Sequence, residues 1–113
     1  MQYLLLIHSS ENGDAQAGDR EEMLKRYGVF TQELRDSGKL LGANELQPTV
    51  TATTVRVRNG ETLTTDGPFA ETKEQLGGYY LLDCADIDEA IAYAARIPSA
   101  ERGSIEVRPV LGH

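Results

Sequence analysis

The sequence is poor in the residues that build most metal and redox sites. Its 113 residues include one cysteine, two histidines and no tryptophan. The single cysteine, Cys84, excludes an intramolecular disulfide, and its spacing from His8 and His113 matches no metal-ligand pattern. The chain also lacks a Gly-rich phosphate loop and a Gly-x-Ser-x-Gly nucleophile motif. We therefore expect no metal site and no bound cofactor.

Positive charge and long apolar runs are scarce as well. There are 11 Lys and Arg residues against 18 Asp and Glu residues, and the net charge is −7. A nucleic-acid partner needs clustered cations, so we expect no direct nucleic-acid binding. The longest apolar run, Tyr3 to Ile7, is too short to span a bilayer or to form a signal-peptide core. We therefore expect a cytoplasmic protein with no membrane partner.

The residues that are present suit one folded domain over residues 1–113, since 40% of them are apolar. Two segments, residues 2–8 and 78–84, are apolar on both faces, which is typical of central strands. Weaker strands are expected over 40–46, where Gly42 favours an edge or a bend, and over 104–110.

Helical spacing of apolar residues predicts a first helix that begins at Asp19 and ends at Gly38. A second helix is expected after Asp86, with capping-box spacing to Glu89, and Pro98 ends it. Its buried stripe is predicted to comprise Ile87, Ala90, Ile91, Ala94 and Ile97.

A β-hairpin is predicted over residues 53–58 and 61–65, because Asn59-Gly60 between two alternating segments is a strong signal for a tight turn. This register places Arg58 opposite Glu61, where the two charges attract across the strands. The hairpin is an insertion between the second strand and the second central strand.

This order of elements predicts an α+β fold of the ferredoxin-like class, βαββαβ with an inserted β-hairpin. Two helices cover only one face of such a sheet, so another element must cover the second face. A second copy of the sheet is the simplest candidate, which predicts a homodimer packed face to face or, edge to edge, as a dimeric α/β barrel. A monomer whose hairpin folds over that face is the alternative.

The stretch from Asp66 to Tyr80 holds the densest group of polar side chains. Its first residues, Asp66-Gly67-Pro68, form a turn that needs these residue types for geometry alone. At the mouth of a sheet cleft, Asp66 could also act as a general base or hydrogen-bond acceptor. His8 ends the first strand and is the other catalytic candidate, because imidazole exchanges protons near neutrality. A histidine that caps the core is the alternative.

Several further side chains are candidates for ligand binding. A lysine and an arginine could hold an anionic ligand, a glutamate could pair with Asp66, and two aromatic rings could contact a ligand. The alternatives are solvated loop charges, core or dimer aromatics and an intersubunit ion pair. The candidates are Lys73, Arg108, Glu71, Phe69 and Tyr79.

Asp66-Gly67-Pro68-Phe69, followed by Gly77-Gly78-Tyr79-Tyr80, resembles the DGPF-type branch of the YCII-related proteins. The similarity extends through nearly the whole chain, to the closing Glu106-Val107-Arg108-Pro109. The resemblance implies a ferredoxin-like dimeric α/β barrel and an association with extracytoplasmic-function sigma factors. Other YCII-related proteins carry a histidine near the start of the first helix, paired with an aspartate. This sequence has no histidine there, and Asp66 would supply the acidic half.

Two functions follow as hypotheses. The first is a small dimeric module that binds a ligand or acts in regulation, with a connection to sigma-factor-dependent transcription. The second is a cofactor-free isomerase, lyase or hydrolase that acts on a small polar or aromatic acid. In that enzyme Asp66 and His8 would move protons, and Lys73 or Arg108 would hold the acid.

Overall fold

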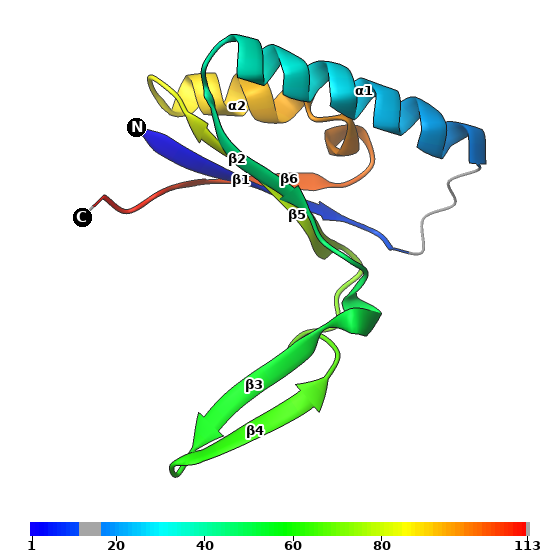
Figure 1. Cartoon of the computed structure of the whole chain (residues 1–113), viewed down its shortest axis with the longest axis vertical. Helices are drawn as coiled ribbons and strands as arrows, with labels where there is room; N and C mark the ends of the chain where they lie inside the picture. Colours follow the sequence, from blue (N-terminus) through cyan, green and yellow to red (C-terminus); the bar gives the residue numbers. More distant parts are fainter. Residues whose placement is uncertain (12–16, 113) are drawn as a thin grey trace.

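The computed structural model describes residues 1–11 and 17–112. Two helices lie on one side of the main sheet, and a β-hairpin lies on the other side (Figure 1). The elements in chain order are β1 (Gln2–Ser9), α1 (Ala17–Asp36), β2 (Leu40–Glu45), η1 (Thr49–Thr51), β3 (Thr53–Arg58), β4 (Glu61–Asp66), β5 (Gln75–Asp83), α2 (Ile87–Arg96), η2 (Pro98–Glu101) and β6 (Ser104–Pro109).

The main sheet has four antiparallel strands in the order β2-β5-β1-β6, which is the ferredoxin-like arrangement. The strands that are apolar on both faces, β1 and β5, lie at its centre as predicted. The weak strand β2 lies at an edge and carries a bulge between Leu40 and Gly42. The two-sided apolar pattern thus agrees with the strand order, because a central strand has a neighbour at each edge and exposes least to solvent.

The core lies between the sheet and the helices. Leu5, Leu34, Leu82 and Ile97 are almost completely buried there. Phe30 of α1 contacts Tyr80 of β5 edge to face, with ring centroids 5.4 Å apart. The hydroxyl groups of Thr31 and Tyr80 form a hydrogen bond of 2.6 Å. This layer fixes the helices against one face and leaves the other sheet face uncovered.

The helix ends follow the sequence signals in part. Gly38 has a φ of +74°, as a left-handed cap requires, but α1 begins at Ala17, so Asp19 lies inside the helix rather than before it. Asp86 caps α2 by accepting a hydrogen bond of 2.9 Å from the backbone N–H of Glu89. The predicted stripe of α2 was wrong at Ile87 and Ile91, which are 40% and 51% exposed, because helical spacing places both at the border of the face that buries Ala90, Ala94 and Ile97.

The hairpin β3–β4 forms a separate two-stranded sheet with the predicted turn and register. Asn59 and Gly60 have φ values of 52° and 78°, as a type I′ turn needs, and Arg58 pairs with Glu61. The second strand extends to Asp66, one residue further than predicted. In the part of the chain that the structure describes, no helix is long and apolar enough to cross a membrane.

Candidate functional site

On the face of the main sheet opposite the helices, residues that pair across neighbouring strands form rows. One row runs across Arg108, Leu4 and Leu81, and the next across Glu106, Leu6, Tyr79 and Asn44. We call this surface the open sheet face. Its leucines are partly exposed although they lie on central strands. The face is therefore an apolar strip with polar side chains at both edges.

His8 lies on the open sheet face beside two charged residues of β6. Its Nε2 lies 3.6 Å from Oε1 of Glu106, which is ion-pair range but too long for a hydrogen bond. Nε of Arg108 lies 3.8 Å from the other oxygen of Glu106. The His8 side chain is 30% exposed, so a bound molecule could reach it. Glu106 thus lies between the His8 imidazole and the Arg108 guanidinium group.

Tyr79 of the central strand β5 lies in the row of Glu106, next to Asn44 at the opposite edge of the sheet. Its hydroxyl oxygen accepts a hydrogen bond of 2.8 Å from Nδ2 of Asn44 on the neighbouring strand β2. Because Tyr79 pairs with Leu6 and Leu6 pairs with Glu106, the phenol and the carboxylate flank one leucine. The predicted candidates His8, Tyr79 and Arg108 therefore share one surface.

A groove of about 790 Å³ lies at the base of the hairpin. Three predicted candidates line it together: Asp66, Glu71 and Lys73. Glu11 and Glu74 add two more carboxylates to its wall. We call this the basal groove. It brings four carboxylates and one lysine into one concave surface, so its charge is strongly negative.

The turn at the groove is held by hydrogen bonds of the Gly67 backbone, and the side chain of Asp66 takes no part in them. Gly67 has a φ of +98°, its N–H donates to the Ala52 carbonyl at 2.7 Å, and its own carbonyl accepts from Thr54 Oγ1 at 2.8 Å. Within residues 1–11 and 17–112, the Asp66 carboxylate has no hydrogen-bond or ion-pair partner. Its side chain is therefore available to a ligand or to another chain.

In the described part of the chain, no hydrogen bond or ion pair joins Asp66 and His8. The two surfaces are linked by Glu74, which lines the basal groove and whose Oε1 accepts a hydrogen bond of 2.8 Å from Ser104 Oγ. Ser104 pairs with His8 across β1 and β6. Sequence reasoning missed the roles of Ser104, Glu74 and Glu106 around His8, and only the pairing of the first and last strands would have indicated them.

Phe69 is the candidate that the structure places at neither surface. Its side chain is 80% exposed, and it lines neither described pocket. The loop that carries it is held by Gln75, whose Nε2 donates to the Ala70 carbonyl at 3.2 Å. A ring this exposed has little apolar contact within its own chain.

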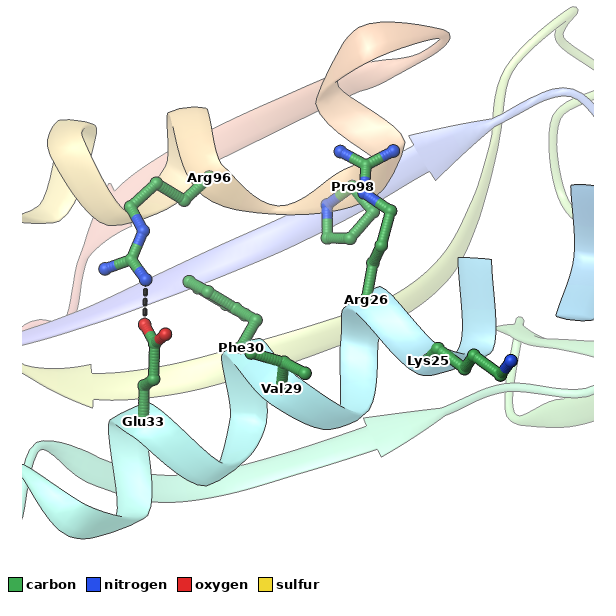
Figure 2. A pocket seen from close by; sticks show the side chains of 7 residues that line it. All are labelled: Lys25, Arg26, Val29, Phe30, Glu33, Arg96 and Pro98. Carbon is green, nitrogen blue, oxygen red and sulfur yellow. Dashed lines mark hydrogen bonds and ion pairs between the residues drawn. The ribbon is translucent and has the colours of Figure 1, made fainter. Parts of the chain in front are cut away.

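A second, smaller depression of about 320 Å³ lies on the helix side (Figure 2). Phe30 and Pro98 are buried beneath it, and cationic side chains border it. Figure 2 shows Arg96 paired with Glu33. Arg26 makes two hydrogen bonds to Glu101, of 3.1 and 2.5 Å. Both arginines therefore already have a carboxylate partner.

In the described residues, no three His, Cys, Asp or Glu side chains gather as a metal site would require. His8 is the group suited to proton exchange, while Arg108 and Lys73 are the cations within reach of an anion.

Comparison with known proteins places the chain in a family. An uncharacterised protein of Rhizobium meliloti (strain 1021), R00369, is 40% identical over 114 residues, which cover 97% of this chain and 92% of the relative. A solved structure of the 5-chloro-2-hydroxyhydroquinone dehydrochlorinase TftG from Burkholderia phenoliruptrix AC1100, in complex with 2,5-dihydroxybenzoquinone, has the same fold. Its TM-score is 0.51 at 12% identity, and the match covers 100% of this chain and 96% of that one. The model of the YCII-related domain matches residues 1–112, and the chain therefore belongs to the YCII-related family.

Proposed function

We propose that this protein is a homodimeric ligand-binding domain that holds a small polar or aromatic acid on the open sheet face. The observation that carries the proposal is the arrangement of Leu4 and Leu6 between the Tyr79 phenol and the Glu106–Arg108 pair. An apolar floor suits a ring or an alkyl body, and a few convergent polar groups at its rim fix orientation.

Charge supports an acid as the ligand. Arg108 is 67% exposed and lies 3.8 Å from Glu106, a distance that leaves the guanidinium donors free to hold a second carboxylate. Tyr79 Oη and Asn44 Nδ2 supply neutral hydrogen-bond donors at the other edge. The ligand would lie across Leu6 with its carboxylate at Arg108.

A homodimer fits the same surface. Leu4, Leu6 and Leu81 stay partly exposed on central strands, and a second sheet would remove this apolar area from water. Such a partner would close the ligand site on its open side. Light scattering at micromolar concentration tests the homodimer. A monomeric mass under all conditions would contradict it.

The binding experiment is a thermal-shift screen of small aliphatic and aromatic acids, followed by calorimetry on the ligands found. Arg108→Gln should weaken binding by about tenfold or more, since it removes a charge-assisted contact. Lys25→Gln is the matched control, because Lys25 lies on the helix side, away from the open sheet face. Equal affinities in both variants would contradict the proposed position of the acid.

A second function, a cofactor-free enzyme, is favoured by the His8–Glu106 pair. The Glu106 carboxylate lies 3.6 Å from Nε2 of the partly exposed His8 side chain, and catalytic hydrogen bonds are often this long before a substrate binds. The neighbour of the same fold, TftG, is a dehydrochlorinase, which is consistent with proton chemistry on such a scaffold. In this enzyme hypothesis, His8 rather than Asp66 transfers the proton.

This enzyme hypothesis has its own test. Each acid that binds is incubated with the protein in deuterium oxide, and deuterium incorporation or product formation is followed by NMR. His8→Gln should abolish the exchange while calorimetry still detects binding. If wild-type protein binds an acid but neither exchanges nor converts it, the domain is a binding module and the enzyme hypothesis fails.

Membership of the DGPF-type branch and association with a sigma factor stay predictions of the sequence resemblance. Co-purification of the protein with each sigma factor of its host tests the second of them. Retention of one sigma factor after washing at high salt would support a regulatory role, and recovery of none would contradict it.

A further inference from the structure

We propose that the acid held on the open sheet face is an aromatic acid with an oxygen acceptor on the ring position opposite its carboxylate. Asn44 sets this preference by fixing the Tyr79 hydroxyl as a hydrogen-bond donor. The inference rests on the proposed function, because it names the class of ligand for the same surface. It adds Asn44 of the edge strand β2 as the residue that determines specificity.

The hydrogen bond between Asn44 and Tyr79 uses one side of the phenol oxygen. Nδ2 of Asn44 donates to this oxygen at 2.8 Å. A phenol has one hydrogen of its own, and an amide N–H that faces the oxygen directs this hydrogen elsewhere. In the part of the chain that the structure describes, no other hydrogen bond involves the Tyr79 hydroxyl. The phenol therefore presents its hydrogen to a bound molecule.

Strand register holds the two side chains on the open sheet face. Asn44 pairs with Tyr79 across β2 and β5, and Tyr79 pairs with Leu6 across β5 and β1. Residues that pair directly point to the same face of a sheet and lie within reach of one another. Tyr79 is partly buried, whereas Asn44 is exposed at the edge. The phenol donor therefore has a fixed position beside the apolar floor.

Arg108 provides the other end of the site. It pairs with Leu4, one row away from Leu6 and Glu106. Its Nε nevertheless lies 3.8 Å from Oε2 of Glu106, so the guanidinium group reaches back toward the row that holds Tyr79. Guanidinium groups bind carboxylates through paired donors. The site thus offers a cation over β6 and a neutral donor over the pair of β2 and β5.

The separation of these two ends suits one aromatic ring. Neighbouring strands lie about 4.8 Å apart, so two to three strand spacings place the phenol and the guanidinium group about 10–14 Å apart. A hydrogen bond of about 2.8 Å at each end takes up part of this span. A benzene ring with a carboxylate and an oxygen at opposite positions fills the rest and lies on Leu6, which is partly exposed.

Hydrogen-bond polarity then separates ligands of the same shape. Para-hydroxybenzoate, para-aminobenzoate and para-methylbenzoate differ only in the group opposite the carboxylate, and the three groups are similar in size. The hydroxyl oxygen accepts a hydrogen bond, the aromatic amine mainly donates because its lone pair is delocalised into the ring, and the methyl group does neither. A donor that faces another donor stays unpaired, which weakens binding. The Tyr79 hydroxyl should therefore favour para-hydroxybenzoate.

Calorimetry with these three acids at neutral pH tests the inference. Wild-type protein should bind para-hydroxybenzoate at least about threefold more tightly than the other two. Asn44→Asp places an acceptor opposite the phenol, whose hydrogen then turns toward the new carboxylate. The phenol oxygen is then an acceptor for the ligand, so para-aminobenzoate should become the preferred acid. Tyr79→Phe should bind all three acids alike.

Gln47→Glu is the matched control for charge. It adds the same negative charge on an exposed residue beyond the end of β2, so it should keep the wild-type order of affinities. A reversed order in Asn44→Asp, with the order kept in Gln47→Glu, would support the inference. Asn44→Asp protein that still prefers the hydroxyl group, or wild-type protein that binds all three acids alike, would overturn it.

Arg108→Gln separates failure of this inference from failure of the proposed function. If wild-type protein binds the three acids alike and Arg108→Gln weakens all of them, the ligand site stands and only its selectivity is wrong. If wild-type protein binds none of them, and no other acid gives a thermal shift, both the site and its selectivity are contradicted.

Discussion

Gly103 lies so close to His8 that a side chain at position 103 would overlap the His8 carbonyl oxygen. Gly103 follows η2 and leads into β6, and its N–H donates to the Ser99 carbonyl at 2.7 Å. The close approach lets β6 pair with β1 directly beyond this point, with Ser104 opposite His8. The absence of a side chain at position 103 thus positions the residues that surround the candidate histidine.

Gly103→Ala should destabilise the protein by about 1–3 kcal/mol, because the added methyl group meets backbone that must shift. It should also displace His8 relative to Glu106. The control is Gly28→Ala in α1, where an added Cβ meets no neighbour and helix propensity improves by about 0.5–1 kcal/mol. Urea unfolding measures the free energy of unfolding of both variants. Equal stabilities would show that Gly103 does not lie tightly against the His8 carbonyl oxygen.

Leu34→Ala should lower the free energy of unfolding by about 2–5 kcal/mol, because Leu34 is fully buried between α1 and the sheet and its loss leaves a cavity. Leu24→Ala in the same helix is the matched control. Its side chain is 56% exposed, so the change should stay within about 0.5 kcal/mol. Similar losses in both variants would mean that Leu24 is covered in solution, for instance by a partner.

The Lys39–Glu89 pair should make stability depend on pH in acid. The hydrogen bond of 2.7 Å from Lys39 Nζ lowers the pKa of Glu89, and the backbone N–H of Ala85 lowers it further. A lowered folded pKa gives stability that is present above the unfolded pKa and is lost as the pH falls through the folded value. The same hydrogen bond raises the pKa of Lys39, so on that side stability is lost only as the pH rises through the raised value.

Glu89→Gln should therefore flatten the acid limb of stability against pH, measured by urea unfolding between about pH 3 and pH 7. Glu21→Gln, an exposed change on the outer part of α1, should leave that limb as in the wild type. An unchanged acid limb in Glu89→Gln would show that the pair contributes nothing to stability.

Cys84 should react slowly with thiol reagents in the native protein. Its side chain is 2% exposed, and burial raises the pKa of its thiol, so little thiolate forms near pH 8. Ellman's reagent should react slowly in buffer and rapidly in concentrated guanidinium chloride. Equal rates in the two conditions would indicate that the chain just after β5, which ends at Asp83, opens readily.

Local features of the sequence were sufficient for most of the fold. Asn59-Gly60 determined the hairpin, since few other residue pairs adopt two consecutive positive φ angles. Asp86 determined where α2 begins, because its side chain caps the first turn. The two-sided apolar pattern of β1 and β5 placed both strands at the centre of the sheet.

Exposure within an element was less predictable. Ile91 fits the helical stripe of α2 by spacing alone, yet it is half exposed because it lies at the border of the face that buries Ala90 and Ala94. Phe69 lies in the Asp66-Gly67-Pro68-Phe69 motif, yet it lines neither of the two described pockets. The spacing of apolar residues in the sequence predicts which side chains share a face of a helix. It does not predict how much of that face the sheet covers.

The sequence alone thus determined the family, the element order and a set of reactive side chains. Only the tertiary structure decided how these side chains group, with His8 beside Glu106 on the open sheet face and Asp66 in the basal groove. The physical reason is strand register. The pairing of β1 with β6 joins the two ends of the chain through a core contact, and no local signal encodes which residue of one strand faces which residue of the other.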